Sequence, residues 1–435
     1  MNDEHIHATG NQISLEQRMA KRPHVLARFH SIADIMDQAV AAGCTADEAE
    51  ERALEQVRQL GRELLGDWAQ EQQDGSLARA RRQHPQAIKH IKKKVSWLTT
   101  FGSVAVIEQL LRIKRGGAEL RPFCREARVK HRGYSRRLQR VLTDFGSEVS
   151  FGQAVSRVRE HYAVEVPVAA VRQHTLRHGK AIPTLAPADA AKPAAQLITQ
   201  MDGSMIPVML PGRGEDARQG RNLFWREVRL CCARPHGQTT AQYGATLSSA
   251  ETASWLWRAT AQSAGLGDPT RVHGVGDGAP WIVDKFQENF GAQGRYLLDF
   301  YHVSEYLAAA ATVIKPKNPK RWRQRQQGRL LENKVATVLR ALAPHRESAT
   351  AENQPVNAAY QYLHKRREHL DYAGARRQSL PIGSGEIESG HRHVIQQRLK
   401  LAGGWWKETH AQAMLNLRVA RANDLWSAYW SPPNN

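Results

Sequence analysis

The feature that most constrains the fold is a change of hydrophobic pattern near residue 196. Short apolar runs then begin, which predict strands at 197–201, 205–210, 223–233, 239–247, 272–275 and 296–298. Helical spacing of apolar residues predicts helices at 250–265, 281–290 and 301–314. Several strands followed by alternating helix and strand indicate an α/β domain with a mixed sheet and helices on both of its faces.

The rest of the chain divides around this domain. Apolar residues at helical spacing predict a helical N-terminal region over 1–78, followed by a strongly basic region over 79–180. Residues 181–195 are rich in Ala and Pro and are typical of a linker. The α/β domain is predicted to cover 196–314 and 379–430, interrupted by a helical, basic insertion at 315–378. Its last two helices are expected at 385–400 and 408–422.

Positive charge is concentrated in the basic region. The chain has 62 Lys and Arg against 42 Asp and Glu, a formal charge of +20 and a pI near 10.1. Residues 79–140 contain 18 Lys or Arg and three acidic residues. Such an excess favours a polyanionic partner, most often nucleic acid, although a solvated basic surface is the alternative. Phosphate contacts are expected from Lys92, Lys93, Lys94, Arg136 and Arg137.

Two local patterns in the basic region suggest how it folds. The apolar runs 104–111 and 120–123 flank Gly116-Gly117, which predicts a hairpin. Residues 150–178 resemble a helix-turn-helix, with a break at 163–166 and Pro167 in the first turn of the second helix. That second helix would present Arg172, Gln173 and Arg177 to a major groove. A pair of packed helices without DNA contact is the alternative.

Composition also argues against several protein classes. No apolar run approaches the roughly 20 residues that a membrane helix needs. The polar, partly acidic start of the chain is unlike a secretory signal. The four cysteines lack the spacing of a zinc site, and we expect a reducing, cytoplasmic compartment.

Three carboxylates form the candidate catalytic set. Asp202 and Asp277 each follow a short apolar run and precede a glycine, so both are expected at adjacent strand ends, where α/β sheets bind ligands. Glu388 is predicted in the first turn of a helix, after Gly383-Ser384-Gly385. Clustered carboxylates of this kind bind Mg²⁺ or Mn²⁺, and two such ions catalyse phosphoryl transfer. Taken singly, an Asp-Gly pair is more often a turn, and Glu388 could serve only the helix dipole.

The sequence around these acids resembles bacterial insertion-sequence transposases of the DDE type, in particular the Kra-type and Mutator-related groups. The similar stretches are Met201-Asp202-Gly203, Gly276-Asp277-Gly278-Ala279 to Trp281, Asp299-Phe300-Tyr301-His302, Gly383 to Glu388, Arg398-Leu399-Lys400 and Gly403-Gly404-Trp405-Trp406. They lie within about 196–421 and are interrupted by the helical insertion. The block from Gly383 to Lys400 is the most specific of them.

The resemblance implies an RNase H-like fold, two magnesium ions and cleavage and strand transfer at the ends of a mobile element. It assigns the three catalytic, metal-binding acids to Asp202, Asp277 and Glu388, and an auxiliary Asp-x-x-His motif to Asp299 and His302. Two alternatives stay open. Asp299 could replace Asp277 as the second metal ligand, and Glu386 could replace Glu388. Because residues 386 and 388 point about 200° apart on a helix, only one of them can face the metal ions.

Further DNA contacts are expected after the last acid. Arg398 and Lys400 could meet the phosphate backbone, and Trp405 and Trp406 could stack on a distorted base, although a solvated helix face and core packing are the respective alternatives. The partners would be terminal repeats and target DNA, with a homodimer or larger assembly holding two ends, associated with the nucleoid. Two rival functions remain: an RNase H-like nuclease without strand transfer, and a non-catalytic DNA-binding regulator derived from a transposase.

Overall fold

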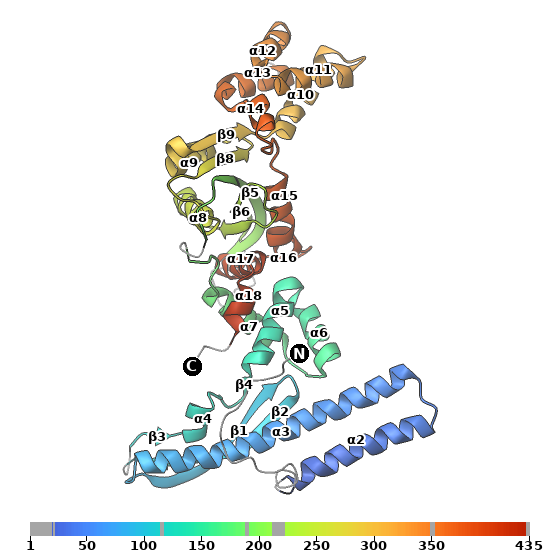
Figure 1. Ribbon diagram of the computed structural model, residues 1–435, viewed down its shortest axis with the longest axis vertical. Coiled ribbons are helices and arrows are strands. Elements are labelled where there is room, and N and C mark those ends of the chain that lie inside the picture. The colour runs from blue at the N-terminus through green and yellow to red at the C-terminus, as the bar shows by residue number, and fades with distance from the viewer. Residues whose placement is uncertain are drawn as a thin grey trace, which may run out of the picture. The chain divides into compact units, whose positions relative to one another are not determined.

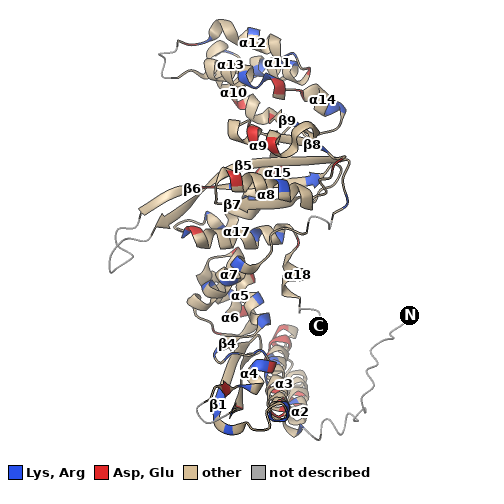
Figure 2. Cartoon of the chain, turned by 90° about the vertical axis from the view of Figure 1, so that its left-hand side faces the viewer, with Lys and Arg blue, Asp and Glu red and all other residues tan. Residues whose placement is uncertain are grey.

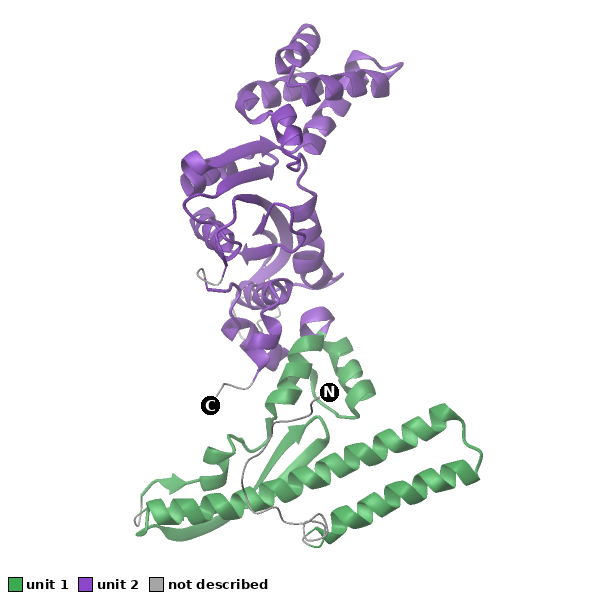
Figure 3. Ribbon diagram, viewed as in Figure 1, with its two compact units in different colours: residues 1–145, 151–171 green, residues 146–150, 172–435 purple. Residues whose placement is uncertain are grey.

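The computed structural model describes residue 20 and residues 22–113, 117–187, 191–210, 222–348 and 353–431. These residues form two compact units, coloured separately in Figure 3. Unit 1 comprises residues 1–145 and 151–171, and unit 2 comprises residues 146–150 and 172–435. The division passes through two helices, α5 (Arg136–Glu148) and α7 (Val168–Ala181).

Unit 1 contains a helical hairpin of α2 (Pro23–Ala41) and α3 (Ala46–Gln83). The α3 helix starts at a capping box, in which the Thr45 hydroxyl accepts from the backbone N–H of Glu48 and the Glu48 carboxylate accepts from that of Thr45. Ion pairs of Arg22 with Glu71 and of Arg28 with Glu63 show that the two helices run antiparallel. The boundary predicted near residue 78 falls inside α3, which packs on β2 (Gly102–Arg112).

The sheet of unit 1 has the order β3-β2-β1-β4. Its central hairpin pairs β1 (Ile88–Thr99) with β2, while β3 (Glu119–Leu120) and β4 (Gly133–Tyr134) are two-residue edge strands. The predicted pairing around Gly116-Gly117 is therefore only the short β2–β3 contact, and residues 114–116 lie outside the described residues. The sequence pattern missed β1 because its first half is lysine-rich. The core contains Ala69, Val95, Trp97, Val104, Val106 and Phe123, the last from α4 (Pro122–Glu126).

Three helices follow the sheet: α5, then α6 (Phe151–Tyr162), then α7. The helices α6 and α7 match the two that the sequence predicts over 150–178. The predicted break is also present, since residues 163–167 are not helical and Ala163 has a φ of 50°.

Unit 2 is built on a five-stranded mixed sheet with the order β7-β6-β5-β8-β9, so the predicted α/β class is confirmed (Figure 1). The antiparallel part comprises β5 (Gln196–Leu210), β6 (Asn222–Pro235) and β7 (Gln242–Thr246), and β8 (Arg271–Gly276) and β9 (Gly294–Leu298) run parallel to β5. The two strands predicted at 197–201 and 205–210 are one strand. The antiparallel ladder to β6 continues through Asp202, which therefore does not end β5.

Helices flank this sheet: α8 (Ala250–Ser263), α9 (Pro280–Phe290) with the 3₁₀ turn η2 (Gly291–Gln293), and α10 (Phe300–Ile314). Their core centres on Trp257, which is fully buried and contacts the rings of Phe286 and Phe290. The Trp257 indole N–H donates to the Thr199 hydroxyl at 2.6 Å, so α8 is tied to the central strand β5.

The predicted insertion is helical, with α11 (Pro319–Leu331), α12 (Val335–Leu342), η3 (Ala343–His345), α13 (Pro355–Lys365), η4 (Arg367–His369) and α14 (Tyr372–Arg377). The helix predicted at 385–400 consists of α15 (Gly385–Gly390), the π-helical segment η5 (His391–Gln396) and α16 (Gln397–Leu399). The last helices are α17 (Glu408–Ala422), which matches its prediction, and α18 (Trp426–Trp430). Among the described residues, no helix combines the length and apolarity that crossing a bilayer requires.

Candidate active site and nucleic-acid interface

Asp202 and Asp277 lie level with each other on neighbouring strands. The parallel pairing of β5 with β8 aligns Leu197 with Val272 and Thr199 with Gly274. The same register, continued past the last paired residues, sets Asp202 opposite Asp277. The two backbones stay close beyond the paired residues, since a Cβ on Gly276 would lie 3.7 Å from the carbonyl oxygen of Met201.

Tyr296 lies near both Asp277 and Asp202. Its hydroxyl accepts from the backbone N–H of Gly278 at 3.4 Å. Burial first, and then the negative charges of Asp277 and Asp202, raise the pKa of Tyr296. Tyr296 therefore stays protonated and neutral beside the two acids.

The helix that carries Glu388 is fixed to the sheet from two sides. From β5, the buried Gln200 side chain accepts from the backbone N–H of Ile387 at 2.8 Å. From the residue after β9, Asp299 Oδ2 accepts from the backbone N–H of Ser384 at 2.7 Å and from the Ser384 hydroxyl. Glu388 itself is exposed. A residue nearly 200 positions from Asp202 is thus held at the same sheet.

Asp299 is buried and its acceptor sites are occupied. Besides Ser384, its carboxylate accepts from the backbone N–H groups of Tyr301 at 2.6 Å and His302 at 3.0 Å, as the N-cap of α10. Asp277 is only half-buried, and its carboxylate accepts from the N–H of Ala279 at 2.9 Å. These environments favour Asp277 over Asp299 as a metal ligand. His302 stacks edge-on against Tyr306 and Tyr362 and pairs with Glu305 at 3.3 Å.

The two acids of α15 also differ. Glu386 is held by Arg234, whose Nε lies 2.9 Å from both carboxylate oxygens. Burial raises the pKa of Glu386, and Arg234 opposes that rise. Because Glu386 is already neutralised by an arginine on β6, Glu388 is the acid of this helix that is available to an ion.

The helical insertion reaches the same edge of the sheet, a contact that the sequence did not predict. The Tyr362 hydroxyl donates to the carbonyl of Asp277, and Arg366 Nε donates to the carbonyl of Gly278 at 2.7 Å. The Arg366 guanidinium also lies over the Tyr362 ring, 4.5 Å from its centroid. These bonds fix the loop after β8 and place a cation beside Asp277.

The donor set fits hard divalent cations. Asp202, Asp277 and Glu388 offer carboxylate oxygens, and within the described ranges none of the three forms an ion pair with Lys or Arg. Across those same residues, no three His, Cys, Asp or Glu side chains are close enough to form a preassembled metal cluster. Ion binding would therefore require the side chains of the half-buried Asp202 and the exposed Glu388 to rotate toward Asp277.

Lys and Arg positions of unit 1, blue in Figure 2, include three consecutive lysines of β1. Lys92, Lys93 and Lys94 are all exposed. Lys93 lies on the core side of the hairpin and pairs with Glu119 at 3.3 Å. Lys92 and Lys94 point to the opposite face, because side chains alternate along a strand. On α5, Arg136 and Arg137 are exposed as expected for phosphate contacts.

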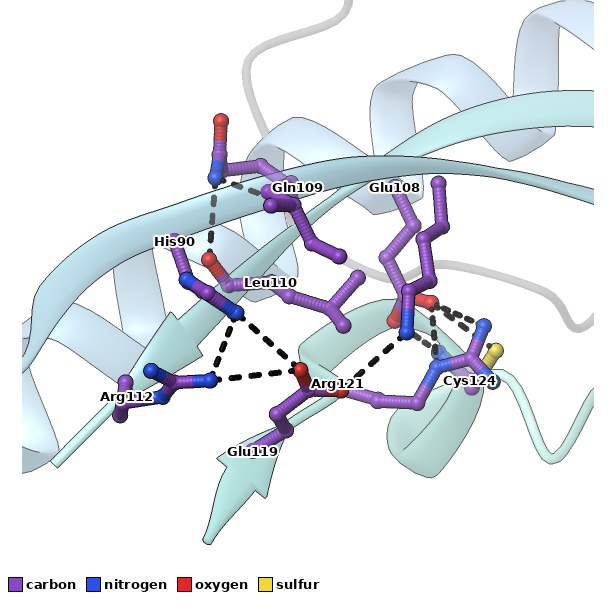
Figure 4. A network of polar contacts seen from close by, with 10 residues as sticks. His90, Glu108, Gln109, Leu110, Arg112, Glu119, Arg121 and Cys124 are labelled. Atoms are coloured by element: carbon purple, nitrogen blue, oxygen red, sulfur yellow. Dashed lines mark hydrogen bonds and ion pairs between the residues drawn. The ribbon is translucent and has the colours of Figure 1, made fainter. Parts of the chain in front are cut away.

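Beneath this surface, Glu108 is a fully buried acid with four donors (Figure 4). Its Oε2 accepts from Nε and Nη2 of Arg121 at 3.0 and 2.8 Å and from the Cys124 thiol at 3.1 Å, and Oε1 accepts from the Cys124 N–H at 2.9 Å. Burial, aided by Glu108, raises the pKa of Cys124 to about 12. An open cavity of about 560 Å³ adjoins this network and is lined in part by Arg121, Arg125, Lys130 and His131.

The structure corrects part of the expected DNA interface. Arg398 is buried, and its Nε donates to the Gly146 carbonyl at 3.0 Å. Trp406 is buried too, because its backbone bonds to β5 at Pro207 and Met209. Neither side chain is available to DNA in this conformation.

Other predicted contacts are exposed. Lys400 and Trp405 lie at the surface, as do Arg172, Gln173 and Arg177 on α7. The ring centroid of Trp405 lies 6.4 Å from that of Trp225, an exposed residue of β6. The sequence pattern did not identify Trp225, since its contact with Trp405 arises only when β5 and β6 pair.

Comparisons with known proteins cover parts of the chain. The model of an uncharacterised protein family, UPF0236, matches residues 262–428. The chain is 27% identical over 158 residues to the "UPF0236 protein in vanSb 3'region" of Streptococcus gallolyticus, a match covering 35% of this chain and 34% of that protein. The chain thus spans about a third of the length of that relative. The family segment includes Asp277, Asp299 and Glu388 but not Asp202.

A solved structure, the Drosophila P element transposase strand transfer complex, aligns with 70% of this chain and 82% of its own, at 9% identity. The TM-score is 0.26, which is too low to support any argument about fold or function.

Proposed function

We propose that this protein is a DNA transposase that cleaves and joins phosphodiester bonds with two divalent ions held by Asp202, Asp277 and Glu388. One observation carries the proposal: the β5–β8 register sets Asp202 opposite Asp277, and Gln200 and Asp299 fix the helix of Glu388 to the same sheet. The strand order β7-β6-β5-β8-β9, with one antiparallel and one parallel half, supports an RNase H-like fold for this domain.

The residues of the site would divide the work of phosphoryl transfer. Two bound Mg²⁺ or Mn²⁺ ions would activate the attacking oxygen and stabilise the leaving oxygen. Asp202 and Asp277 would hold the ions from the sheet, and Glu388 would close the site from its helix. Arg366, fixed by the Gly278 carbonyl, would offer a cation to the phosphate. The reaction needs no covalent enzyme intermediate, because water or a 3′ hydroxyl attacks the phosphate directly.

The basic surfaces of unit 1 would bind the DNA ends. Lys92, Lys94, Arg136 and Arg137 are exposed and would contact phosphates without reading sequence. The exposed side chains of α7 would supply base contacts, and Trp405 with Trp225 would stack on an unpaired base. Since transposition joins two ends, we propose that the protein acts as a dimer or larger assembly.

The decisive experiment measures Mg²⁺-dependent cleavage of DNA that flanks the coding region, using the full chain and its Asp202→Asn, Asp277→Asn and Glu388→Gln variants. We expect cleavage by the unmodified protein and none by the three variants. Asp284→Asn is the control, because Asp284 is an exposed acid on α9. Cleavage that persists in Glu388→Gln but disappears in Glu386→Gln would move the third acid to Glu386.

A second assay separates strand transfer from hydrolysis alone. Pre-cut ends with a free 3′ hydroxyl are incubated with target DNA and Mg²⁺, and joined products are detected on a denaturing gel. Joined products support a transposase, whereas cleavage without joining supports the rival nuclease. DNA binding with neither reaction supports the non-catalytic regulator.

A further inference from the structure

A buried histidine lies beside the proposed metal site and has no assigned role. His391 is 5% exposed, and neither of its ring nitrogens has a hydrogen bond of good geometry among the described residues. Its Nε2 lies 3.2 Å from Oδ2 of Asp202. Because a buried imidazole that lacks well-formed hydrogen bonds is costly, the nearby Asp202 carboxylate is the group with which His391 can reduce that cost.

The local fold explains how His391 reaches Asp202. It is one turn after Glu388 on the same helical segment, at the first residue of the π-helical η5. At Gly390 the helix packs closely on the sheet, since a Cβ there would lie 3.0 Å from Leu230, the cross-strand neighbour of Asp202. The glycine permits this close approach, and π-helical turns are frequent at functional sites.

We propose that His391 is a positioning residue for the Asp202 carboxylate, an inference that rests on the proposed metal-dependent function. Its Nε2–H would donate to Oδ2 and turn the other carboxylate oxygen toward Asp277. The Asp202 side chain is 41% exposed, which leaves room for the carboxylate to turn, and turning Oδ1 toward Asp277 would replace its present hydrogen bond from the N–H of Gly203 at 2.7 Å. Hydrogen bonds to ligating carboxylates orient them, and their loss typically weakens metal affinity roughly 10–100-fold.

The test measures Mn²⁺ binding to the full chain without DNA, from the electron paramagnetic resonance signal of free Mn²⁺. We expect His391→Phe, which lacks a donor, to weaken binding roughly 10–100-fold. His391→Gln, whose amide can donate to the same oxygen, should stay within about threefold, since replacing the donor keeps the bond. His178→Gln is the matched control, because His178 is also buried but bonds to Tyr429.

A double variant tests whether His391 affects Mn²⁺ binding through Asp202. In an Asp202→Asn background, adding His391→Phe should cause no further loss of Mn²⁺ affinity, because both changes remove one interaction. Unchanged affinity in His391→Phe, or equal weakening in the Phe and Gln variants, overturns the donor role. If the Phe variant fails to fold, a tenfold or greater loss in His391→Gln overturns it as well.

The outcomes also separate this inference from the proposed function. Binding that depends on Asp202 but not on His391 rejects only the inference. The absence of any Asp202-dependent Mn²⁺ binding rejects the proposed function and the inference together.

Discussion

The sheets of the two units handle their acidic residues in opposite ways. In unit 1, the buried Glu108 receives four hydrogen bonds and neutralises Arg121, while Lys92, Lys93 and Lys94 of β1 are exposed. In unit 2, Asp202 and Asp277 lie side by side, both are only half-buried, and neither pairs with a Lys or Arg of the described chain. A saturated carboxylate stabilises a fold, whereas unpaired neighbouring carboxylates repel each other unless a cation binds.

The same contrast recurs inside unit 2. Asp299 and Glu386 are saturated, by Ser384 and the start of α10 in one case and by Arg234 in the other. Asp277 and Glu388, their neighbours in sequence or register, are not. The state of each carboxylate thus separates supporting residues from candidate ligands, and substitutions at the two kinds of position should have different effects.

The largest effect is expected at Asp277. Asp277→Asn should lower the rate of Mg²⁺-dependent DNA cleavage roughly a thousandfold, about 4 kcal/mol, because metal ions contribute several kcal/mol of transition-state stabilisation. Its thermal unfolding midpoint should stay close to that of the unmodified protein. The measurement pairs single-turnover cleavage with calorimetry, and a large drop in stability with retained cleavage would reverse the assignment.

Glu108 should show the opposite behaviour. Glu108→Ala leaves Arg121 and the Cys124 N–H without their acceptor, which should lower the free energy of unfolding of unit 1 by about 3 kcal/mol. Denaturant titration followed by Trp fluorescence measures this loss. Under conditions where the variant remains folded, its Mg²⁺-dependent cleavage should match that of the unmodified protein.

Asp299 should combine a loss of stability with a smaller loss of activity. Asp299→Ala removes the N-cap of α10 and the bonds to Ser384, which should cost about 2 kcal/mol of unfolding free energy. Because the helix of Glu388 is then held less firmly, cleavage should fall roughly tenfold. A loss as large as that of Asp277→Asn, with stability unchanged, would instead identify Asp299 as the second ligand.

The smallest effect is expected on the basic face of β1. Substituting both Lys92 and Lys94 by Ala should reduce the slope of log affinity against log salt by about 1.8, since each phosphate contact contributes about 0.9. Lys93→Ala is the matched comparison, and its slope should change less because Lys93 pairs with Glu119. Fluorescence anisotropy with a DNA duplex at several salt concentrations measures both, and equal changes per lysine would contradict the two-face arrangement.

Where apolar residues set the secondary structure, the sequence predicted it well. The strands β6 to β9 and the helices α8, α9, α10 and α17 follow from periodicity, because their buried faces require it. The pattern failed at β1, where lysines occupy the exposed end of the strand. It also failed at β5, where Gly203 and Ser204 suggested an end but the ladder to β6 continues.

By itself, the sequence determined the α/β class and the basic character of the chain, since composition and periodicity are local properties, and it predicted the three acids of the proposed site. Tertiary structure alone decided which acids are saturated. Arg234 pairs with Glu386, and Ser384 donates to Asp299. His391, nearly 190 residues along the chain from Asp202, lies beside the Asp202 carboxylate. It also buries Arg398 and Trp406, for which the sequence had predicted DNA contacts. Strand register and helix packing determine these side-chain contacts, because they bring together residues that no local sequence pattern connects.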